Sequence, residues 1–163
     1  AMPRSIFATS MSCWKKLICI RPDGSKFKRA DCCSNLSPKF KSMGSDMHNL
    51  IPTFDWFLET RNGSYESVQF GGMGEYKICL NGGVVPKEPI AGARGNLARA
   101  YLYMSFQHRI LIQNKLEDRL RVWHFEDPPD EIENKRNSLI ELVQGNRNPF
   151  VDHPEIVGHV RDF

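Results

Sequence analysis

The sequence lacks any apolar run that approaches the ~20 residues a membrane-spanning helix requires. A transmembrane helix is therefore not expected, and no membrane partner is predicted. Internal repeats and low-complexity tracts are also missing, which excludes repeat architectures. Strong charge is missing too, because the net charge is +3 and the pI is near 8.6. A dedicated nucleic-acid-binding domain is usually more basic than this, so charge alone does not identify a partner.

The apolar content that is present suffices to bury one sizeable core. The 163 residues are 40% hydrophobic, and this length lies in the usual range of one domain, so we expect residues 1–163 to form a single domain. Basic side chains are concentrated in one segment, since residues 15–41 contain eight Lys and Arg against two Asp. This excess would attract a polyanion, although a solvated basic face is the simpler interpretation of the count alone.

Cysteine is present in an odd number, five, so at least one thiol is unpaired or is cross-linked between chains. Four of the five, Cys13, Cys19, Cys32 and Cys33, cluster in the first fifth of the chain. The adjacent Cys32-Cys33 pair does not give the C-x-x-C spacing that places two thiolates on one zinc ion. We therefore interpret the cluster as the remnant of a disulfide framework, which fits an oxidising compartment better than a cytosol.

The first half of the chain shows little helical periodicity. Residues 1–45 contain many turn formers and are predicted to be loop-rich, with a short strand at residues 17–20. A short helix or turn is expected at residues 46–52, which a proline closes. Glycines bracket residues 75–80, and this spacing predicts one strand of a hairpin there.

Helical patterns begin after Pro89. Apolar spacing predicts an amphipathic helix over residues 95–109, a second helix over 115–123, and a third that follows Pro128-Pro129 and ends at Gly145, a typical C-terminal cap. In the third helix Ile132, Leu139, Ile140 and Val143 share one face. Residues 146–154 form a polar tail without a pattern of its own. The resulting fold class is α+β, mainly helical with a small antiparallel sheet.

Three stretches, in order, resemble the endonuclease I family, the periplasmic and secreted non-specific nucleases of Gram-negative bacteria. They are residues 45–50 (Ser-Asp-Met-His-Asn-Leu), residues 88–89 followed by 94–104 (Arg-Gly-Asn-Leu-Ala-Arg-Ala-Tyr-Leu-Tyr-Met), and residues 144–150 (Gln-Gly-Asn-Arg-Asn-Pro-Phe). The resemblance covers residue 3 to about residue 154. It implies a ββα-metal (His-Me finger) core surrounded by helices, with one divalent cation, Mg²⁺, at the active site.

The family's catalytic motif is of the type Glu-His-Val-Val-Pro, in which the glutamate binds the metal and the histidine activates water. Pro3 matches the last residue of that motif, and Cys13-Trp14 matches a family Cys-Trp pair that fixes the register. The glutamate and histidine then fall immediately before residue 1. We therefore expect a single endonuclease I-like domain that lacks its N-terminal part. No signal peptide is recognised in this chain, so the periplasmic or secreted location of the family is not assigned to it.

Two residues carry the metal and catalytic roles that the resemblance implies. Asn49 matches the family's metal-ligating asparagine, whose amide oxygen is a hard donor suited to Mg²⁺. The alternative is an asparagine that closes a turn, and one neutral oxygen without a carboxylate is a poor magnesium site. Arg29 resembles the catalytic arginine beside the scissile phosphate, where a guanidinium stabilises developing charge. Its alternative is a solvated basic residue.

Two further residues are predicted on the substrate-binding side. Arg61 aligns with a family arginine that contacts a phosphate, although Leu58 stands where an asparagine is expected. His48 precedes Asn49, and the resemblance implies a hydrogen-bonding, structural role for it rather than that of the base. Arg94 and Arg99 are expected to be surface or structural ion-pair residues rather than ligands. The resemblance implies that at least one family disulfide has moved or been lost, because Tyr76 stands where many relatives have a cysteine.

The resulting prediction is a magnesium-dependent endonuclease that hydrolyses DNA, and RNA as a further substrate, through contacts to the phosphate backbone. Cleavage by this chain should be impaired because the Glu-His pair is missing. The alternative is a catalytically inactive nucleic-acid-binding or interaction remnant of the family. Nucleic acid is the partner in both cases, and no protein partner is predicted.

Overall fold

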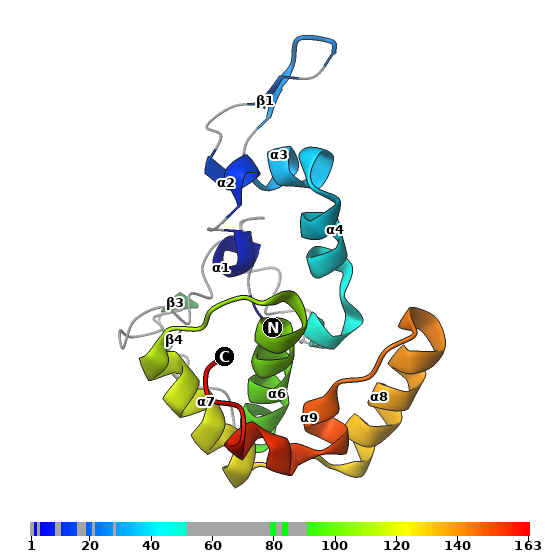
Figure 1. Cartoon of the computed structure of the whole chain (residues 1–163). Helices are drawn as coiled ribbons and strands as arrows, with labels where there is room; N and C mark the ends of the chain where they lie inside the picture. Colours follow the sequence, from blue (N-terminus) through cyan, green and yellow to red (C-terminus); the bar gives the residue numbers. More distant parts are fainter. Residues whose placement is uncertain are drawn as a thin grey trace.

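The computed structural model describes residues 2, 4–8, 11–15, 19–20, 22–27, 29–51, 79–80, 83–84 and 91–163, and the structural statements below concern these residues. In chain order the elements are α1 (Arg4–Ala8), α2 (Ser12–Lys15), β1 (Cys19–Ile20), β2 (Lys26–Phe27), α3 (Arg29–Leu36), α4 (Pro38–Ser45), the 3-10 helix η1 (Met47–Asn49), β3 (Cys79–Leu80), β4 (Gly83–Val84), α6 (Ala91–His108), α7 (Asn114–Glu126), α8 (Glu131–Gln144), α9 (Pro149–Asp152) and the 3-10 helix η2 (Pro154–Gly158). The prediction of a mainly helical fold is confirmed. Figure 1 shows α6 to α9 grouped together, with α1 to α4 and the β1 hairpin extending away from them.

Helix α6 lies at the centre of this group. It begins four residues before the predicted start and ends one residue before the predicted end. Every residue from 97 to 105 is buried, so this part of α6 is enclosed on all sides. The prediction of an amphipathic helix is wrong for this part. Helix α7 packs against it through Leu120 and Trp123, which are 1% and 4% exposed. The second predicted helix is thereby confirmed, with one more residue at its start and three more at its end.

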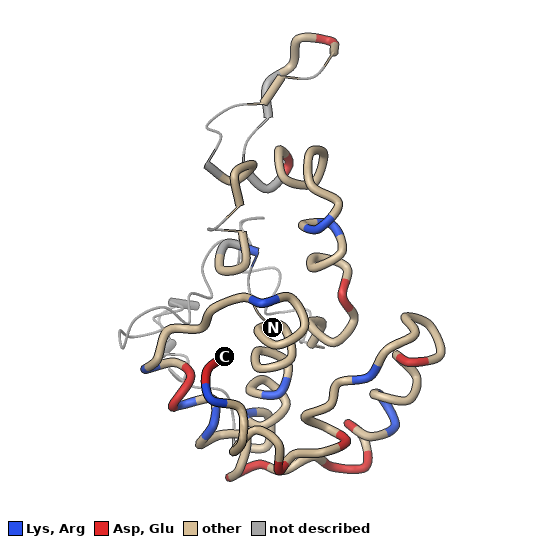
Figure 2. The backbone as a smooth tube through the Cα atoms, viewed as in Figure 1, with Lys and Arg blue, Asp and Glu red and all other residues tan. Residues whose placement is uncertain are grey.

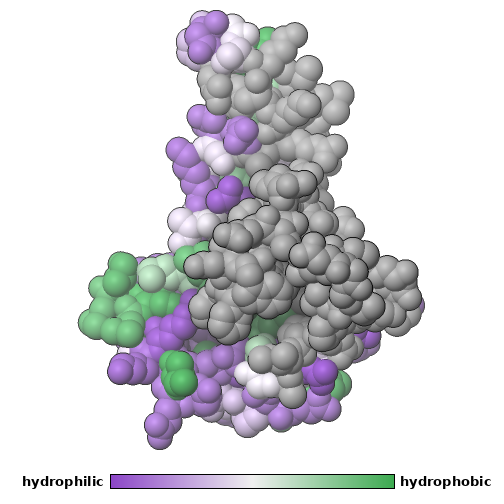
Figure 3. Space-filling model, turned by 180° about the vertical axis from the view of Figure 1, so that it is seen from behind, coloured by the Kyte–Doolittle hydropathy of each residue, from purple (hydrophilic) through white to green (hydrophobic). Residues whose placement is uncertain are grey.

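Helix α8 has the caps that its sequence predicts. The Asp130 side chain accepts a hydrogen bond from the Glu133 N–H at 2.7 Å, and Gly145 ends the helix with a left-handed φ of 80°. The predicted apolar face is only partly buried, because Ile140 is 2% exposed while its neighbours on that face are open to solvent. Figure 3 shows hydrophobic surface at the edge where α8 lies, and the exposed apolar residues of this helix are Ile132, Leu139, Leu142 and Val143.

Buried Arg99 joins α6 to α8 and to the segment that connects α7 to α8. Its guanidinium donates to the Glu133 carboxylate and to the Asp127 carbonyl oxygen, at 2.9 Å and 2.6 Å for the Nε and Nη1 contacts. Only 1% of this residue is exposed. The expectation of a structural ion pair is confirmed for Arg99. The Arg94 guanidinium lies 6.0 Å from the centre of the Trp123 ring, within reach of a cation–π contact.

The predicted unpatterned tail at residues 146–154 is wrong. Helix α9 occupies its centre, with Asn148 as N-cap and Pro149 at the first position, and η2 follows it. Phe150 and Val157 are fully buried. These elements span four and five residues, so helical periodicity in the sequence cannot show them, and tertiary burial rather than local propensity stabilises them.

The loop-rich prediction for residues 1–45 is also wrong, because α1, α2, α3 and α4 occupy much of this segment. Helix α4 begins with a Ser37 cap, whose hydroxyl accepts from the Phe40 N–H at 3.2 Å, and with Pro38 at its first position. Phe40 packs against Phe7 of α1 with ring centres 5.5 Å apart. One buried cluster contains side chains from α1, α4, α6, α7 and η2, so the N-terminal helices share a core with the C-terminal ones.

The described strands form short antiparallel pairs. In the first pair Cys19 lies opposite Phe27 and Ile20 opposite Lys26, which places β1 at the last two residues of the predicted strand at 17–20. In the second, β3 pairs with β4, so the end of the predicted strand at 75–80 lies in a hairpin. Residues 75–78 lie outside the described part of the chain.

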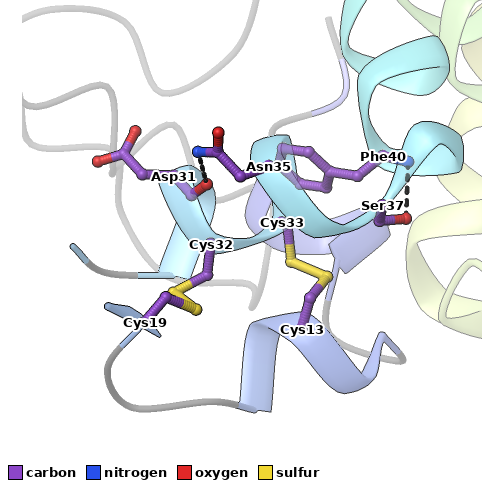
Figure 4. The surroundings of a disulfide bond; sticks show 8 residues. All are labelled: Cys13, Cys19, Asp31, Cys32, Cys33, Asn35, Ser37 and Phe40. Carbon is purple, nitrogen blue, oxygen red and sulfur yellow. Dashed lines mark hydrogen bonds between the residues drawn. A yellow bond between two sulfur atoms is a disulfide. The ribbon is translucent and has the colours of Figure 1, made fainter. Parts of the chain in front are cut away.

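Two disulfides secure the N-terminal segment. Figure 4 shows both reaching from α3, where Cys33 bonds to Cys13 of α2 and Cys32 bonds to Cys19 of β1. The predicted disulfide framework is confirmed for these four cysteines. The side chain of Cys79 lies outside the described part of the structure. Among the described helices none is both long and apolar enough to cross a bilayer.

Candidate functional site

The turn at residues 46–49 carries two of the predicted site residues. Asp46 caps η1, because its carboxylate accepts from the His48 N–H at 3.0 Å and its carbonyl oxygen accepts from the Asn49 N–H at 3.0 Å. The predicted short helix at residues 46–52 is confirmed for these residues. Asp46, His48 and Asn49 are all buried. The turn therefore points its polar side chains into the protein.

The Asp46 carboxylate is the centre of a hydrogen-bond network. One oxygen accepts from the Tyr103 hydroxyl at 3.0 Å and from His108 Nε2 at 2.9 Å, and the other accepts from Gln144 Nε2 at 3.0 Å in addition to the backbone. Burial by itself would raise the pKa of Asp46, but these hydrogen bonds outweigh it and hold the pKa below its ordinary value of 3.8. Asp46 is therefore a buried, ionised anchor.

Residues on both sides of the α8 cap complete the network. Gln144 Oε1 accepts from the Met47 N–H at 2.8 Å, and its amide nitrogen also donates to Asn146 Oδ1 at 2.8 Å. Asn146 in turn donates to the Tyr103 hydroxyl at 2.7 Å. Burial and the nearby Asp46 charge raise the pKa of Tyr103, so its hydroxyl stays protonated and donates to the carboxylate. The three stretches that carry the family resemblance thus meet around one turn.

His48 occupies the inner side of this network. It is 3% exposed, its ring centre lies 4.5 Å from that of Tyr103, and its Nε2 lies 3.2 Å from the Asn146 carbonyl oxygen. Because a carbonyl only accepts, Nε2 carries the proton. Burial lowers the pKa of His48, so the ring is neutral at neutral pH. This environment supports the structural hydrogen-bonding role, and substrate binding by His48 stays a prediction.

Asn49 uses its side-chain amide on the backbone of residue 2. Its Oδ1 accepts from the Met2 N–H at 2.7 Å, and its Nδ2 donates to the Met2 carbonyl oxygen at 3.0 Å. In the described part of the chain, no three His, Cys, Asp or Glu side chains are grouped in a way that could hold a metal ion. A neutral amide oxygen that already accepts a hydrogen bond does not make a Mg²⁺ site by itself. The described residues therefore do not fit the implied magnesium ion.

A polar pocket of about 350 Å³ opens beside the network. It gives solvent access to the edge where His108 contacts Asp46, and that pair of side chains is only 13% and 5% exposed. The pocket residues come from α4, the Asp46 turn, the end of α6 and the end of α8: Ser42, Ser45, Asp46, Gln107, His108, Gln144 and Asn146.

The side chains of the two predicted phosphate-binding arginines lie outside the described part of the structure, so their roles stay predictions. Arg29 is the first residue of α3, and its side chain lies outside what the structure describes. Arg61 lies wholly outside the described residues. Figure 2 shows basic residues on α4, and the exposed basic side chains of this helix are Lys39 and Lys41.

Sequence reasoning assigned no role to Asp46, Tyr103, Gln144 or Asn146. All four lie inside the stretches that resemble the family, so the resemblance was the available signal. Their shared role depends on pairs up to 98 positions apart in the sequence. Such pairs leave no local pattern of residue types.

Comparison with known proteins assigns the chain to a family. The family described as Endonuclease I matches residues 1–155. An extracellular deoxyribonuclease of Aeromonas hydrophila is 31% identical over 162 residues, which cover 93% of this chain and 62% of that protein. A periplasmic deoxyribonuclease of the same organism is 30% identical, with 93% and 60% covered. An extracellular ribonuclease of Bacillus subtilis is 34% identical over 86 residues, 42% of this chain and 30% of that protein.

The chain spans about three fifths of the length of the deoxyribonucleases that it matches. The match nevertheless includes nearly all of this chain, and its three characteristic stretches are joined in space by the network around Asp46. The chain therefore belongs to the endonuclease I family.

Proposed function

We propose that this protein is an endonuclease that hydrolyses DNA phosphodiesters without sequence preference. The observation that carries the proposal is the convergence of Asp46, Tyr103 and Gln144 on one turn, because each comes from a different family stretch. Two relatives named deoxyribonucleases support DNA as the substrate. Recognition through the phosphate backbone explains why base sequence would not matter.

The catalytic roles follow from the chemistry of phosphodiester hydrolysis. The reaction needs a cation beside the scissile phosphate and a base that takes a proton from the attacking water. We assign the phosphate contact to the guanidinium of Arg29 and a flanking phosphate to Arg61. The family fold implied by the resemblance is the His-Me finger. The family reaction uses one Mg²⁺ ion, which the described residues do not fit, so no step is assigned to it here.

The proposed reaction also needs a general base. No Glu-His dipeptide occurs in the 163 residues, and the family register places that pair directly ahead of Ala1. A missing general base typically lowers the rate by about 10²–10⁴-fold. We therefore expect the 163-residue chain alone to bind DNA and to cleave it poorly.

RNA is a second candidate substrate. A relative named an extracellular ribonuclease matches 42% of the chain, and backbone contacts to phosphate do not by themselves distinguish the two nucleic acids. The two disulfides and the relatives named extracellular and periplasmic support a working location in an oxidising compartment.

Plasmid nicking tests the proposal. Highly purified 163-residue chain is compared with the same chain extended by Glu-His ahead of Ala1, and with a matched Gln-Ala extension. We expect EDTA-sensitive nicking from the Glu-His form and little from the other two. Equal inactivity of all three forms would contradict the nuclease assignment. Robust EDTA-sensitive cleavage by the unextended chain would show that another residue, with His48 the first to test, serves as base.

A further inference from the structure

We propose that Asn49 is a backbone clamp, which holds residue 2 against the turn at residues 47–49, and that it does not bind a cation while it does so. The side-chain amide contacts both backbone groups of Met2, through hydrogen bonds of 2.7 Å and 3.0 Å. Asn49 is 8% exposed and Met2 is 3% exposed. Both partners are therefore buried away from water, so water cannot replace these hydrogen bonds if they are lost.

The chain uses the same device a second time, at a place where no catalysis is assigned. Asn137 of α8 accepts from the Asn148 N–H at 2.8 Å and donates to the Asn148 carbonyl oxygen at 3.1 Å. It is 2% exposed. As with Asn49 and Met2, one side-chain amide pairs with both backbone groups of one residue. The Asn137 contact fixes the chain immediately ahead of α9. A side-chain amide suits this task because it carries one acceptor and one donor side by side, as the backbone of one residue does.

A metal ligand would need a different arrangement. Mg²⁺ demands near-octahedral oxygen coordination and is usually held by one or two carboxylates and several waters. Asn49 Oδ1 has two lone pairs, and one of them already accepts from the Met2 N–H at 2.7 Å, so a cation at this oxygen would have only the other. The amide therefore serves the backbone, and in the described part of the chain no three His, Cys, Asp or Glu side chains are grouped so that they could hold a cation.

The clamp has a positioning consequence for the family reaction. In the family register, residues 1 and 2 occupy the two valine positions that follow the catalytic Glu-His pair. Asn49 fixes the backbone at residue 2, so it aligns that segment with η1 and with the network around Asp46. Asn49 is therefore a positioning residue for the segment at residue 2.

Substitution by aspartate separates the two roles because they predict opposite results. A carboxylate would strengthen a cation site, whereas in the clamp it would place a negative oxygen against the Met2 carbonyl oxygen. We expect Asn49→Asp in the 163-residue chain to lower Tm in EDTA by about 3–8 °C at neutral pH. Burial next to a carbonyl raises the pKa of the introduced carboxyl in the folded state. The full decrease in Tm is therefore expected above the folded-state pKa. It disappears as the pH falls toward about 4, where the protonated carboxyl can again donate to the Met2 carbonyl oxygen.

Two variants serve as controls. Asn137→Asp should show the same pH-dependent loss, at least as large, because the Asp152 carboxylate also faces Asn137. Asn134→Asp, at an exposed asparagine of the same helix, should change Tm by less than about 1 °C. If Asn49→Asp folds at acidic pH but not at neutral pH, the clamp is supported in the same way.

The cation arm compares the Tm of wild type and Asn49→Ala in MgCl₂ with that in KCl of equal ionic strength. We expect no magnesium-specific rise in either protein. A rise in wild type that is lost in Asn49→Ala would overturn the proposal, as would an Asn49→Asp protein that keeps the wild-type Tm in EDTA. None of these measurements requires cleavage, so they separate the clamp from the proposed nuclease function.

Discussion

Gly95 lies so close to the end of α7 that a β-carbon at its position would stand 1.8 Å from the carbonyl oxygen of Asp127. The Gly95 N–H also donates to the Asp127 carboxylate at 2.8 Å. The same carbonyl accepts from buried Arg99. The Arg-Gly-Asn stretch that resembles the family is therefore a close contact between α6 and the chain that connects α7 to α8.

Substitution Gly95→Ala should consequently destabilise the protein by about 1–3 kcal/mol, because backbone rather than a flexible side chain must move to make room. Urea denaturation followed by circular dichroism measures the change. Gly92→Ala is the matched control on the same helix, since nothing lies within 4 Å of a β-carbon there. We expect it to be neutral or stabilising by up to about 1 kcal/mol. Equal effects of the two substitutions would contradict the close contact.

Substitution Asp46→Asn should remove a buried charge that accepts four hydrogen bonds. Donors left unpaired cost about 1–3 kcal/mol, and the loss should depend on pH. Because the folded-state pKa of Asp46 is lowered, its contribution is fully present above the unfolded-state pKa and is lost as the pH falls through the folded one. The stability gap between wild type and variant should therefore narrow in acid. Asp118→Asn, at an exposed site, is the control and should change the free energy of unfolding by less than about 0.5 kcal/mol at neutral pH. A difference between wild type and Asp46→Asn that widens in acid would count against the assignment.

The disulfide pairing is open to direct chemical test. Peptide mapping without reductant should recover Cys13 with Cys33 and Cys19 with Cys32. Removal of one disulfide by the double substitution Cys13→Ser/Cys33→Ser should cost about 3 kcal/mol, as expected for a loop of this length. Recovery of Cys13 joined to Cys32 would show that α3 is oriented differently.

Binding to duplex DNA should be weak, independent of sequence, and sensitive to salt. The exposed pair Lys39 and Lys41 on α4 motivates a double substitution to alanine, measured by fluorescence anisotropy. Affinity falls as salt rises, and each phosphate contact adds to that fall. If the double variant has lost two contacts, its affinity should fall about tenfold less than that of wild type between about 50 and 200 mM salt. Lys135→Ala on α8 is the control, because it removes a charge from another exposed site. Affinity that does not respond to salt would contradict a phosphate-backbone contact.

How far the sequence predicted the fold depended on the length of the elements. The three long helices after Pro89 were predicted because apolar spacing extends over several turns in each. Helices α1, α2 and α9 have only four or five residues, too few for such a pattern. Helix α3 is longer but carries polar residues and cysteines, and the bonds of Cys32 and Cys33 to two different segments replace an apolar face.

The candidate site was also predicted only in part. The turn at residues 46–49 was predicted from its own sequence and from the proline that follows it. The side chains that hold this turn were not predicted, because Gln144 and Tyr103 act on it through three-dimensional contacts. The resemblance identified these residues without indicating what they contact.

The network around Asp46 has a consequence for the order of folding. Gln144 contacts the turn across 97 and 98 positions in the sequence, so the chain must close a long loop before these bonds form. Local helices can form earlier, but the orientation of Asn49 and His48 is fixed only once residues near the C-terminal end have docked. A chain cut short of Asn146, whether during synthesis or by proteolysis, would keep its central helices and lose the geometry of the turn.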